Sequence, residues 1–386
     1  MAVAPAAQAG TVTMRRTAIE VTVPPGASAI PGQYIIRLKP GVLVSGVMSP
    51  LGIRPLYTYE HVINGFTARM TTARLNEIRT HPAVAAIEQD AVATALDVPE
   101  GPAAPGTRVP PVAPTTSWGL DRIDQRRLPL NRSYNAAHTG AGVTAYIVDS
   151  GIDKTNSQFT GRVVPGYSTV GDDNGTNDCL GHGTMTAGII GGATWGVARA
   201  VKLSPVRVLG CDGTGAYSQI IAGLDWVAAH AVKPAVANVS LGGPKSAATN
   251  AAATALADAG IFVGVAAGNS GDDACDYSPA GAPRVLAVGA SAINDTLSVF
   301  TNVGPCVGLY APGTDIVSAR LGGGSTQGSG TSFAAPYVTG VGALFKQTYG
   351  DYPTATVNKW ISDASTSGVL TGPYAANSRL LYSAGL

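Results

Sequence analysis

Apolar and polar positions follow two different patterns along the chain. In the first, residues 33–39 alternate as in a half-buried strand, and residues 61–70 predict a second strand that is broken at Asn64-Gly65. Residues 71–79 begin with a capping threonine and space their apolar side chains helically, and residues 84–88 predict a closing strand. Residues 33–95 therefore predict one small α+β unit.

The second pattern starts at Trp118, where short apolar strands alternate with helices. The strand candidates are β-branched and almost continuously apolar, as in strands buried on both faces; they are residues 143–148, 206–209, 236–239, 261–265 and 285–288. Helical stretches such as 218–229 and 247–259 lie between them. This alternation predicts a mostly parallel sheet with helices on both sides, and such sheets carry active sites at the carboxyl ends of their strands.

A proline-rich stretch separates the two patterns. Six of the 21 residues from Asp97 to Ser117 are proline, which predicts an extended, exposed linker. We therefore divide the chain into an N-terminal segment (1–31), the α+β unit (32–96), the linker (97–117) and a larger domain (118–386). Met1 to Gly10 lacks the basic and apolar regions of a signal peptide, although Ala7-Gln8-Ala9 is typical of the end of one. A trimmed signal and a disordered tail both remain open.

The composition and net charge of the chain limit which classes of function are expected. Apolar residues make up 45% of the chain and charged residues 13%, so that the chain is expected to fold. A formal net charge of +1 gives no electrostatic reason to expect nucleic acid or an anionic membrane as a partner. No apolar run approaches the ~18 residues that a membrane helix needs. We expect a monomer that acts on neither nucleic acid nor membrane.

The four cysteines, Cys179, Cys211, Cys275 and Cys306, form no C-x-x-C pair. An even number without zinc spacing favours two disulfides and hence export. Four reduced thiols in a cytosolic protein are the alternative, and the spacing leaves all three disulfide connectivities open.

Three candidate catalytic residues stand at the ends of predicted elements. Asp149 follows an apolar strand and precedes Ser-Gly, His182 lies between glycines at a helix start, and Ser332 opens an apolar helix that runs to about Gln347. A serine hydroxyl becomes a nucleophile when a neutral imidazole takes its proton, and a carboxylate orients that imidazole. Taken alone, each of these residues is explained more simply as a helix cap or a packing position than as a catalytic residue. Together they indicate a hydrolase with Ser332 as nucleophile, His182 as general base and Asp149 as orienting carboxylate.

The order Asp, His, Ser and the flanking residues resemble the subtilisin family, within it the proteinase K and aqualysin branch. The motifs are Asp-Ser-Gly at 149–151, His-Gly-Thr at 182–184 and Gly-Thr-Ser-x-Ala-x-Pro at 330–336, and the resemblance covers residues 118–382. It implies a three-layer α/β/α domain that acts as a secreted serine endopeptidase on polypeptides. Residues 32–96 resemble the family's inhibitory prodomain, a ferredoxin-like α+β fold. The resemblance thus implies a zymogen that cleaves itself between about Ala93 and Ser117.

The resemblance also assigns roles to further residues. Asn269 matches the asparagine whose side-chain amide completes the oxyanion hole. The pocket for the residue before the scissile bond matches Ser240, Leu241, Gly242, Ala266 and Gly268. Its glycine and alanine positions imply room for a large apolar or aromatic residue, and hence broad specificity. The strand that pairs with substrate matches Gly213, Gly215 and Tyr217. The disulfides implied are Cys179–Cys211 and Cys275–Cys306.

One departure from the family and one ion site complete these expectations. Thr186 stands where proteinase K has a free cysteine, so that low sensitivity to thiol reagents is expected. The chemistry requires no cofactor, but a structural calcium site of the aqualysin branch matches Asp121, Asp124, Gln125, Asn131 and Ser133. Acids that cap a surface turn are the alternative at these positions.

Other function classes fit less well. A catalytically silent relative that acts as a binding protein would be expected to lack one of the three catalytic residues, and none is missing. An α/β-hydrolase would need Gly-x-Ser-x-Gly and another order of residues, and a zinc protease of the His-Glu-x-x-His type has no matching motif.

Overall fold

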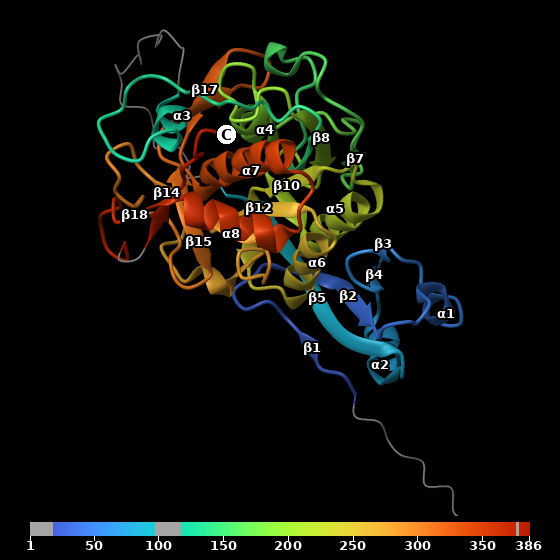
Figure 1. The fold of residues 1–386 in the computed structure, drawn as a ribbon. Coiled ribbons are helices and arrows are strands. Elements are labelled where there is room, and N and C mark those ends of the chain that lie inside the picture. The colour runs from blue at the N-terminus through green and yellow to red at the C-terminus, as the bar shows by residue number, and fades with distance from the viewer. Residues whose placement is uncertain (1–17, 97–116, 376–377) are drawn as a thin grey trace, which may run out of the picture.

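A parallel sheet forms the centre of the larger domain (Figure 1). The computed structural model describes residues 18–96, 117–375 and 378–386. Within them the sheet has nine strands in the order β18-β19-β15-β14-β12-β10-β6-β8-β7, and only the pair β18–β19 is antiparallel. In that order the strands span Thr366–Ser367, Arg379–Leu380, Val307–Pro312, Leu286–Ser291, Phe262–Ala266, Ala235–Val239, Thr144–Asp149, Lys202–Arg207 and Tyr167–Ser168. The predicted parallel sheet is confirmed.

Helices cover both faces of this sheet because its strands are apolar on both sides. In β6, Ala145 and Ile147 belong to the core that includes α4 (His182–Gly191) and α7 (Thr331–Tyr349). Tyr146 and Val148 of the same strand belong to the core that includes α5 (Tyr217–His230) and α6 (Ala247–Asp258). The three-layer α/β/α class is thereby confirmed.

Shorter elements join these layers. They are α3 (Trp118–Ile123), α8 (Thr354–Ala364), the 3-10 turns η1 (Ser157–Phe159) and η2 (Ala274–Asp276), and β13 (Tyr277–Ser278). The strands β16 (Ile316–Ala319) and β17 (Ser325–Gly328) pair antiparallel with each other. Most of these elements are too short to show an apolar period, which explains why the sequence pattern did not predict them. The exception is α8, whose buried residues Val357 and Ile361 have helical spacing that the sequence interpretation missed.

The N-terminal domain is a separate α+β unit beside α5 and α6 (Figure 1). Its elements are β1 (Val21–Thr22), β2 (Ala29–Leu38), α1 (Val44–Met48), β3 (Tyr57–Tyr59), β4 (Gly65–Arg69), α2 (Thr72–Thr80) and β5 (Val84–Ala95). The strand order is β5-β2-β4-β3, and β1 pairs with β5. Ile36, Phe66 and Ile87 lie in a core of their own. The predicted α+β fold is confirmed, and its sheet begins before residue 32.

Two strand predictions in this domain were wrong in extent. The strand predicted over 61–70, broken at Asn64-Gly65, begins only at Gly65: residues 65–69 form β4, residues 60–64 lie in bends, and the unpredicted strand 57–59 precedes them. The strand predicted over 84–88 continues to Ala95. Its second half leaves the N-terminal domain and pairs with β9 (Thr214–Ala216) and β11 (Leu241–Pro244) of the larger domain. The free edges of these two strands complete its backbone hydrogen bonds, and a local period in the sequence does not reveal such distant partners.

Candidate active site

Asp149, His182 and Ser332 lie at the ends of three neighbouring elements. Asp149 is the last residue of β6, His182 is the first of α4, and Ser332 is the second of α7. The loops that carry the first two approach closely, since a Cβ atom on Gly183 would lie 2.1 Å from the carbonyl oxygen of Gly151. Glycine is therefore required at this position for the carboxylate and the imidazole to meet.

Asp149 and His182 form a buried pair. Nδ1 of the imidazole lies 2.7 Å from Oδ1 of Asp149, and the backbone nitrogen of Ser150 donates to the same oxygen at 2.7 Å. The other carboxylate oxygen accepts a hydrogen bond from Oγ1 of Thr186 at 3.3 Å. A carboxylate beside Nδ1 favours the tautomer of a neutral imidazole that carries its proton there, and Nε2 of that tautomer can act as a base.

Ser332 is held at the start of α7, beside α4. Its hydroxyl donates to the carbonyl of Ser240 at 3.0 Å, and its own carbonyl accepts from the Ser240 hydroxyl at 2.7 Å. The ring of the next residue, Phe333, lies 5.5 Å from the imidazole of His182, centroid to centroid. The structure thus brings the starts of the two helices, and with them the predicted base and nucleophile, to one place.

Two donors converge on the carbonyl oxygen of Leu96. Nδ2 of Asn269 donates to it at 2.8 Å, and the backbone nitrogen of Ser332 donates at 3.3 Å. The Asn269 side chain is oriented by Thr331, whose backbone nitrogen and hydroxyl donate to Oδ1 at 2.9 and 2.8 Å. The sequence interpretation missed Thr331, although its position directly before the predicted nucleophile was a signal.

Residues 92–95 of β5 lie between β9 and β11, and Leu96 directly follows them; we call the space between β9 and β11 the cleft and this segment the strand 92–96. Val92 pairs with Ala216, and Ala95 pairs with Leu241 on the opposite side. The backbone nitrogen of Ala95 also donates to the carbonyl of Gly213 at 3.0 Å. Of the predicted substrate-binding residues, Gly213 and Gly215 thus lie on one side of this strand, and Leu241 and Gly242 lie on the other.

The remaining predicted residues, Tyr217, Ala266 and Gly268, lie outside the two strands that pair with residues 92–95. Tyr217 begins α5, is fully buried, and donates its hydroxyl to the carbonyl of Pro244 at the end of β11. Ala266 ends β12, and Gly268 has φ +108°, a conformation that favours glycine. A Cβ atom on Gly242 would lie 3.3 Å from Cδ1 of Leu96, which shows that the Leu96 side chain lies against this wall.

Comparisons with known proteins agree with this geometry. Residues 140–380 match the subtilase family, and residues 33–95 match the peptidase inhibitor I9 family. The chain belongs to the subtilase family. It is a serine peptidase with an inhibitor-type prodomain, as the motifs predicted.

Individual relatives cover most of this subtilase. The "Alkaline serine exoprotease A" of Vibrio alginolyticus is 42% identical over 325 residues, which are 84% of this chain and 59% of that protein. The "Extracellular serine proteinase" of Thermus sp. (strain Rt41A) is 42% identical over 85% of this chain and 82% of its own. The crystal structure of a cold adapted subtilisin-like serine proteinase matches with a TM-score of 0.68 at 45% identity, covering 70% of this chain and 98% of that one.

Buried carboxylates join the prodomain to the subtilase domain. Glu88 of the prodomain accepts from the backbone nitrogen of Ala247 at 2.9 Å at the start of α6, and Asp90 accepts from that of Ser218 at 3.1 Å at the start of α5. In return Asp225 of α5 accepts from three successive backbone nitrogens of the prodomain, those of residues 60, 61 and 62. Burial raises the pKa of both Glu88 and Asp90.

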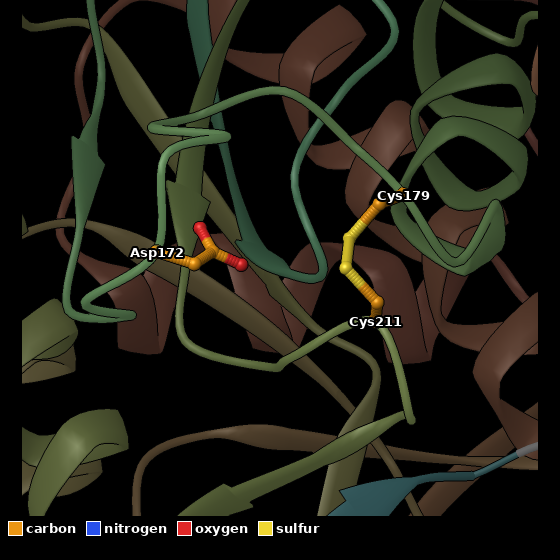
Figure 2. Close-up of side chains that lie close together, drawn as sticks. All are labelled: Asp172, Cys179 and Cys211. Carbon is orange, nitrogen blue, oxygen red and sulfur yellow. A yellow bond between two sulfur atoms is a disulfide. The ribbon is translucent and has the colours of Figure 1, made fainter.

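Both disulfides expected from the resemblance are present. Cys179 bonds Cys211, and Cys275 bonds Cys306. Asp172 lies close to the first of them (Figure 2) and pairs with Arg207, with Nη2 2.7 Å from Oδ2. Because the two sulfurs are bonded to each other and the carboxylate faces a guanidinium, these three residues form a disulfide beside an ion pair and not a metal site.

The predicted calcium residues lie on and after α3. Asp121 accepts from the backbone nitrogens of Asn131 and Arg132 at 3.1 and 2.7 Å. Oδ2 of Asp124 accepts from the backbone nitrogen of Asn135 at 2.9 Å, whereas its buried Oδ1 has no hydrogen-bond partner among the described residues. Burial, together with the nearby charge of Asp121, raises the pKa of Asp124. An orphaned, buried carboxylate oxygen is the arrangement that a cation would satisfy.

The predicted neutral ligands of this site have partners within the protein. The Gln125 amide nitrogen donates to the carbonyls of Arg127 and Pro129 at 2.6 and 2.8 Å. The Ser133 hydroxyl donates to Oδ1 of Asn131 at 2.5 Å.

In the part of the chain that the structure describes, no helix combines the length and the apolar character that a membrane span needs.

Proposed function

We propose that this subtilase is a secreted serine endopeptidase that is made as a zymogen and cleaves its own chain directly after Leu96. The observation that carries the proposal is the position of the Leu96 carbonyl oxygen, which faces the amide of Asn269 and the backbone nitrogen of Ser332 at 2.8 and 3.3 Å. Two donors aimed at one carbonyl oxygen, beside a serine at a helix start, form an oxyanion hole. The proposed bond falls within the interval from Ala93 to Ser117 that the sequence left open.

The reaction follows from these positions. Oγ of Ser332 attacks the carbonyl carbon of Leu96 while its proton passes to Nε2 of His182, and Asp149 stabilises the resulting imidazolium. The carbonyl oxygen becomes negative and receives stronger hydrogen bonds from Asn269 and Ser332. The imidazolium then protonates the nitrogen of residue 97, the C–N bond breaks, and Leu96 remains as an ester on Ser332. Water, deprotonated by His182, hydrolyses this ester.

Broad specificity is supported by how the cleft holds the strand 92–96. Pairing with β9 and β11 uses backbone groups, which every peptide offers. The Leu96 side chain lies beside Gly242, which has no side chain to narrow the space there. We therefore propose polypeptides as substrates, with apolar or aromatic residues preferred before the scissile bond.

After cleavage the prodomain is proposed to remain bound as an inhibitor. Its strand fills the cleft, and the carboxylates of Glu88 and Asp90 bind the starts of α6 and α5. Secretion is supported by the two disulfides and by the Thermus relative, which is named an extracellular serine proteinase. That the mature enzyme is a monomer remains a prediction.

We further propose that Asp121 and Asp124, with Gln125, Asn131 and Ser133, hold a structural calcium ion. The buried Oδ1 of Asp124 supports this proposal because it has no other partner among the described residues. Two carboxylates and neutral oxygens suit a hard cation. The ion would stabilise the segment after α3 and would take no part in the bond cleavage.

The test compares the full chain with Ser332→Ala. We expect the wild-type precursor to yield two fragments, with N-terminal sequencing of the larger one starting at Asp97 and casein digested by the product. Ser332→Ala should remain one folded chain without activity. A wild-type chain that folds, forms both disulfides and still digests nothing would support the alternative, a silent relative acting as a binding protein.

A further inference from the structure

A buried carboxylate outside the predicted site accepts hydrogen bonds from both loops of the catalytic pair. Asp178, 8% exposed, lies four residues before His182. Its Oδ1 accepts from the Ser150 hydroxyl and from the backbone nitrogens of residues 180 and 181, each at 2.9 Å. Its Oδ2 accepts from the backbone nitrogen and the hydroxyl of Thr184, at 2.8 and 2.6 Å.

These five donors surround the two residues that must meet. Residues 180, 181 and 184 lie on both sides of His182, and Ser150 directly follows Asp149. The Ser150 hydroxyl also accepts from the backbone nitrogen of Gly183 at 2.9 Å. One carboxylate therefore connects the end of β6 to the first turn of α4, with a single hydroxyl as the bridge.

The chemistry of the group suits this connection. An ionised carboxylate only accepts hydrogen bonds, and here every one of the five partners donates. The start of a helix also favours a negative charge. An amide of the same shape would place its NH2 group against one set of these donors, whichever way it is turned. Asparagine at position 178 would therefore leave the size of the side chain unchanged and disrupt the network.

We propose that Asp178 is a positioning residue for the peptidase reaction, which fixes the backbone of His182 relative to Asp149. This inference rests on the proposed roles of the three catalytic residues. Misplacing a catalytic group by about 1 Å costs about 100-fold in rate. Asp178 touches neither the strand 92–96 nor the donors that face Leu96, so its loss should lower kcat and leave KM nearly unchanged.

The experiment measures kcat and KM of the processed enzyme on a chromogenic peptide, with the active sites counted by an acylating inhibitor. Asp178→Asn should lower kcat per counted site by about 100-fold. Ser150→Ala, which keeps the carboxylate and removes the bridge, should give a smaller loss of kcat. In the double variant, kcat should decrease by a factor well below the product of the two single-variant factors, because both changes break the same hydrogen-bond network.

Asp295→Asn is the matched control. Asp295 is a buried carboxylate, 6% exposed, that pairs with Arg122 at 2.7 Å and contacts none of the catalytic residues through its side chain. This variant should unfold at a lower temperature while kcat per counted site stays at the wild-type value. A loss of kcat that merely followed lower stability would appear in this control as well.

The outcomes separate this inference from the proposed function. If the wild type is active, two results for Asp178→Asn would overturn the positioning role alone. One is a wild-type kcat, and the other is a KM that rises as much as kcat falls. If Asp178→Asn does not fold, Ser150→Ala decides: a lower kcat at constant KM supports the inference, and an unchanged kcat overturns it. An inactive wild-type enzyme would instead overturn the proposed function.

Discussion

The carboxylate of Glu88 accepts a hydrogen bond from the backbone nitrogen of Ala247 at 2.9 Å, although the two residues belong to different domains. Its other oxygen accepts from the hydroxyl of Ser246, so that a prodomain side chain provides acceptors for the start of α6. Burial of Glu88 and of Asp90 is linked to prodomain binding, because both carboxyl groups return to water when the prodomain leaves. The affinity of the complex should therefore depend on pH.

The sign follows from the raised pKa of both groups. The bound prodomain holds these protons more tightly than the free one, in which both carboxyl groups return to water. Binding is therefore strongest at low pH, where both carboxyl groups are protonated, and weakens as the pH rises through their raised pKa values. We expect the inhibition constant of the cleaved prodomain to increase as the pH rises from acid towards neutrality, by up to about tenfold per pH unit for each of the two groups. The variant Glu88→Gln with Asp90→Asn should lose this slope, and tighter inhibition at higher pH would contradict the prediction.

Removing the amide of Asn269 should affect the rate and not substrate binding. Its Nδ2 is aimed at the oxygen that becomes negative during the reaction, so its contribution increases in the transition state. For Asn269→Ala we expect kcat to fall by about 100- to 1,000-fold with KM nearly constant. Steady-state kinetics on a short peptide substrate measures both. A variant with wild-type kcat would show that the oxyanion is stabilised elsewhere.

Thr186 should contribute through the second oxygen of Asp149. Its hydroxyl lies 3.3 Å from Oδ2 of Asp149 and 3.1 Å from the carbonyl of Gly183. Thr186→Val keeps the shape and removes the hydrogen bond, so that kcat should fall by about tenfold. Thr186→Ser keeps the hydroxyl and should stay near wild type. Equal losses in the two variants would assign the effect to packing instead.

Calcium should raise the melting temperature of the wild type, because a ligand that binds only the folded state stabilises it. Asp124→Asn removes half of the charge that the two carboxylates provide and should abolish this rise. The exposed Asp363→Asn variant serves as a control that should keep it. Differential scanning calorimetry with calcium and with a chelator gives the comparison. A wild type that melts at one temperature in both conditions would rule out the site.

The central sheet and the catalytic motifs could be predicted because their signals are local. Strands such as 144–149 are apolar on both faces, and their flanking glycines are needed where loops approach closely, as at Gly183. The motif around Ser332 can likewise be identified from adjacent residues, because the serine stands at the start of an apolar helix. Such features follow from a few adjacent residues.

The features that the sequence did not reveal depend on distant partners. Leu96 lies in the cleft because β9 and β11, more than 100 residues further on, provide free edges for its strand. Residues 60–62 form a bend instead of a strand because Asp225 accepts hydrogen bonds from their backbone nitrogens. Asp178 stood in the sequence as an ordinary acid before a cysteine. No pattern among the residues adjacent to any of these three positions indicates these contacts.

The continuity of β5 has a consequence for where the chain is cut. One strand is paired with β2 at Ile87 and with β9 at Val92, so the folded prodomain fixes how far the strand reaches into the cleft. The number of residues between the prodomain core and the cleft therefore determines which peptide bond lies beside Ser332. This constraint acts in addition to any preference for leucine. One residue inserted after Ala91 would reverse the facing of every later side chain and present the carbonyl of Ala95 in place of that of Leu96.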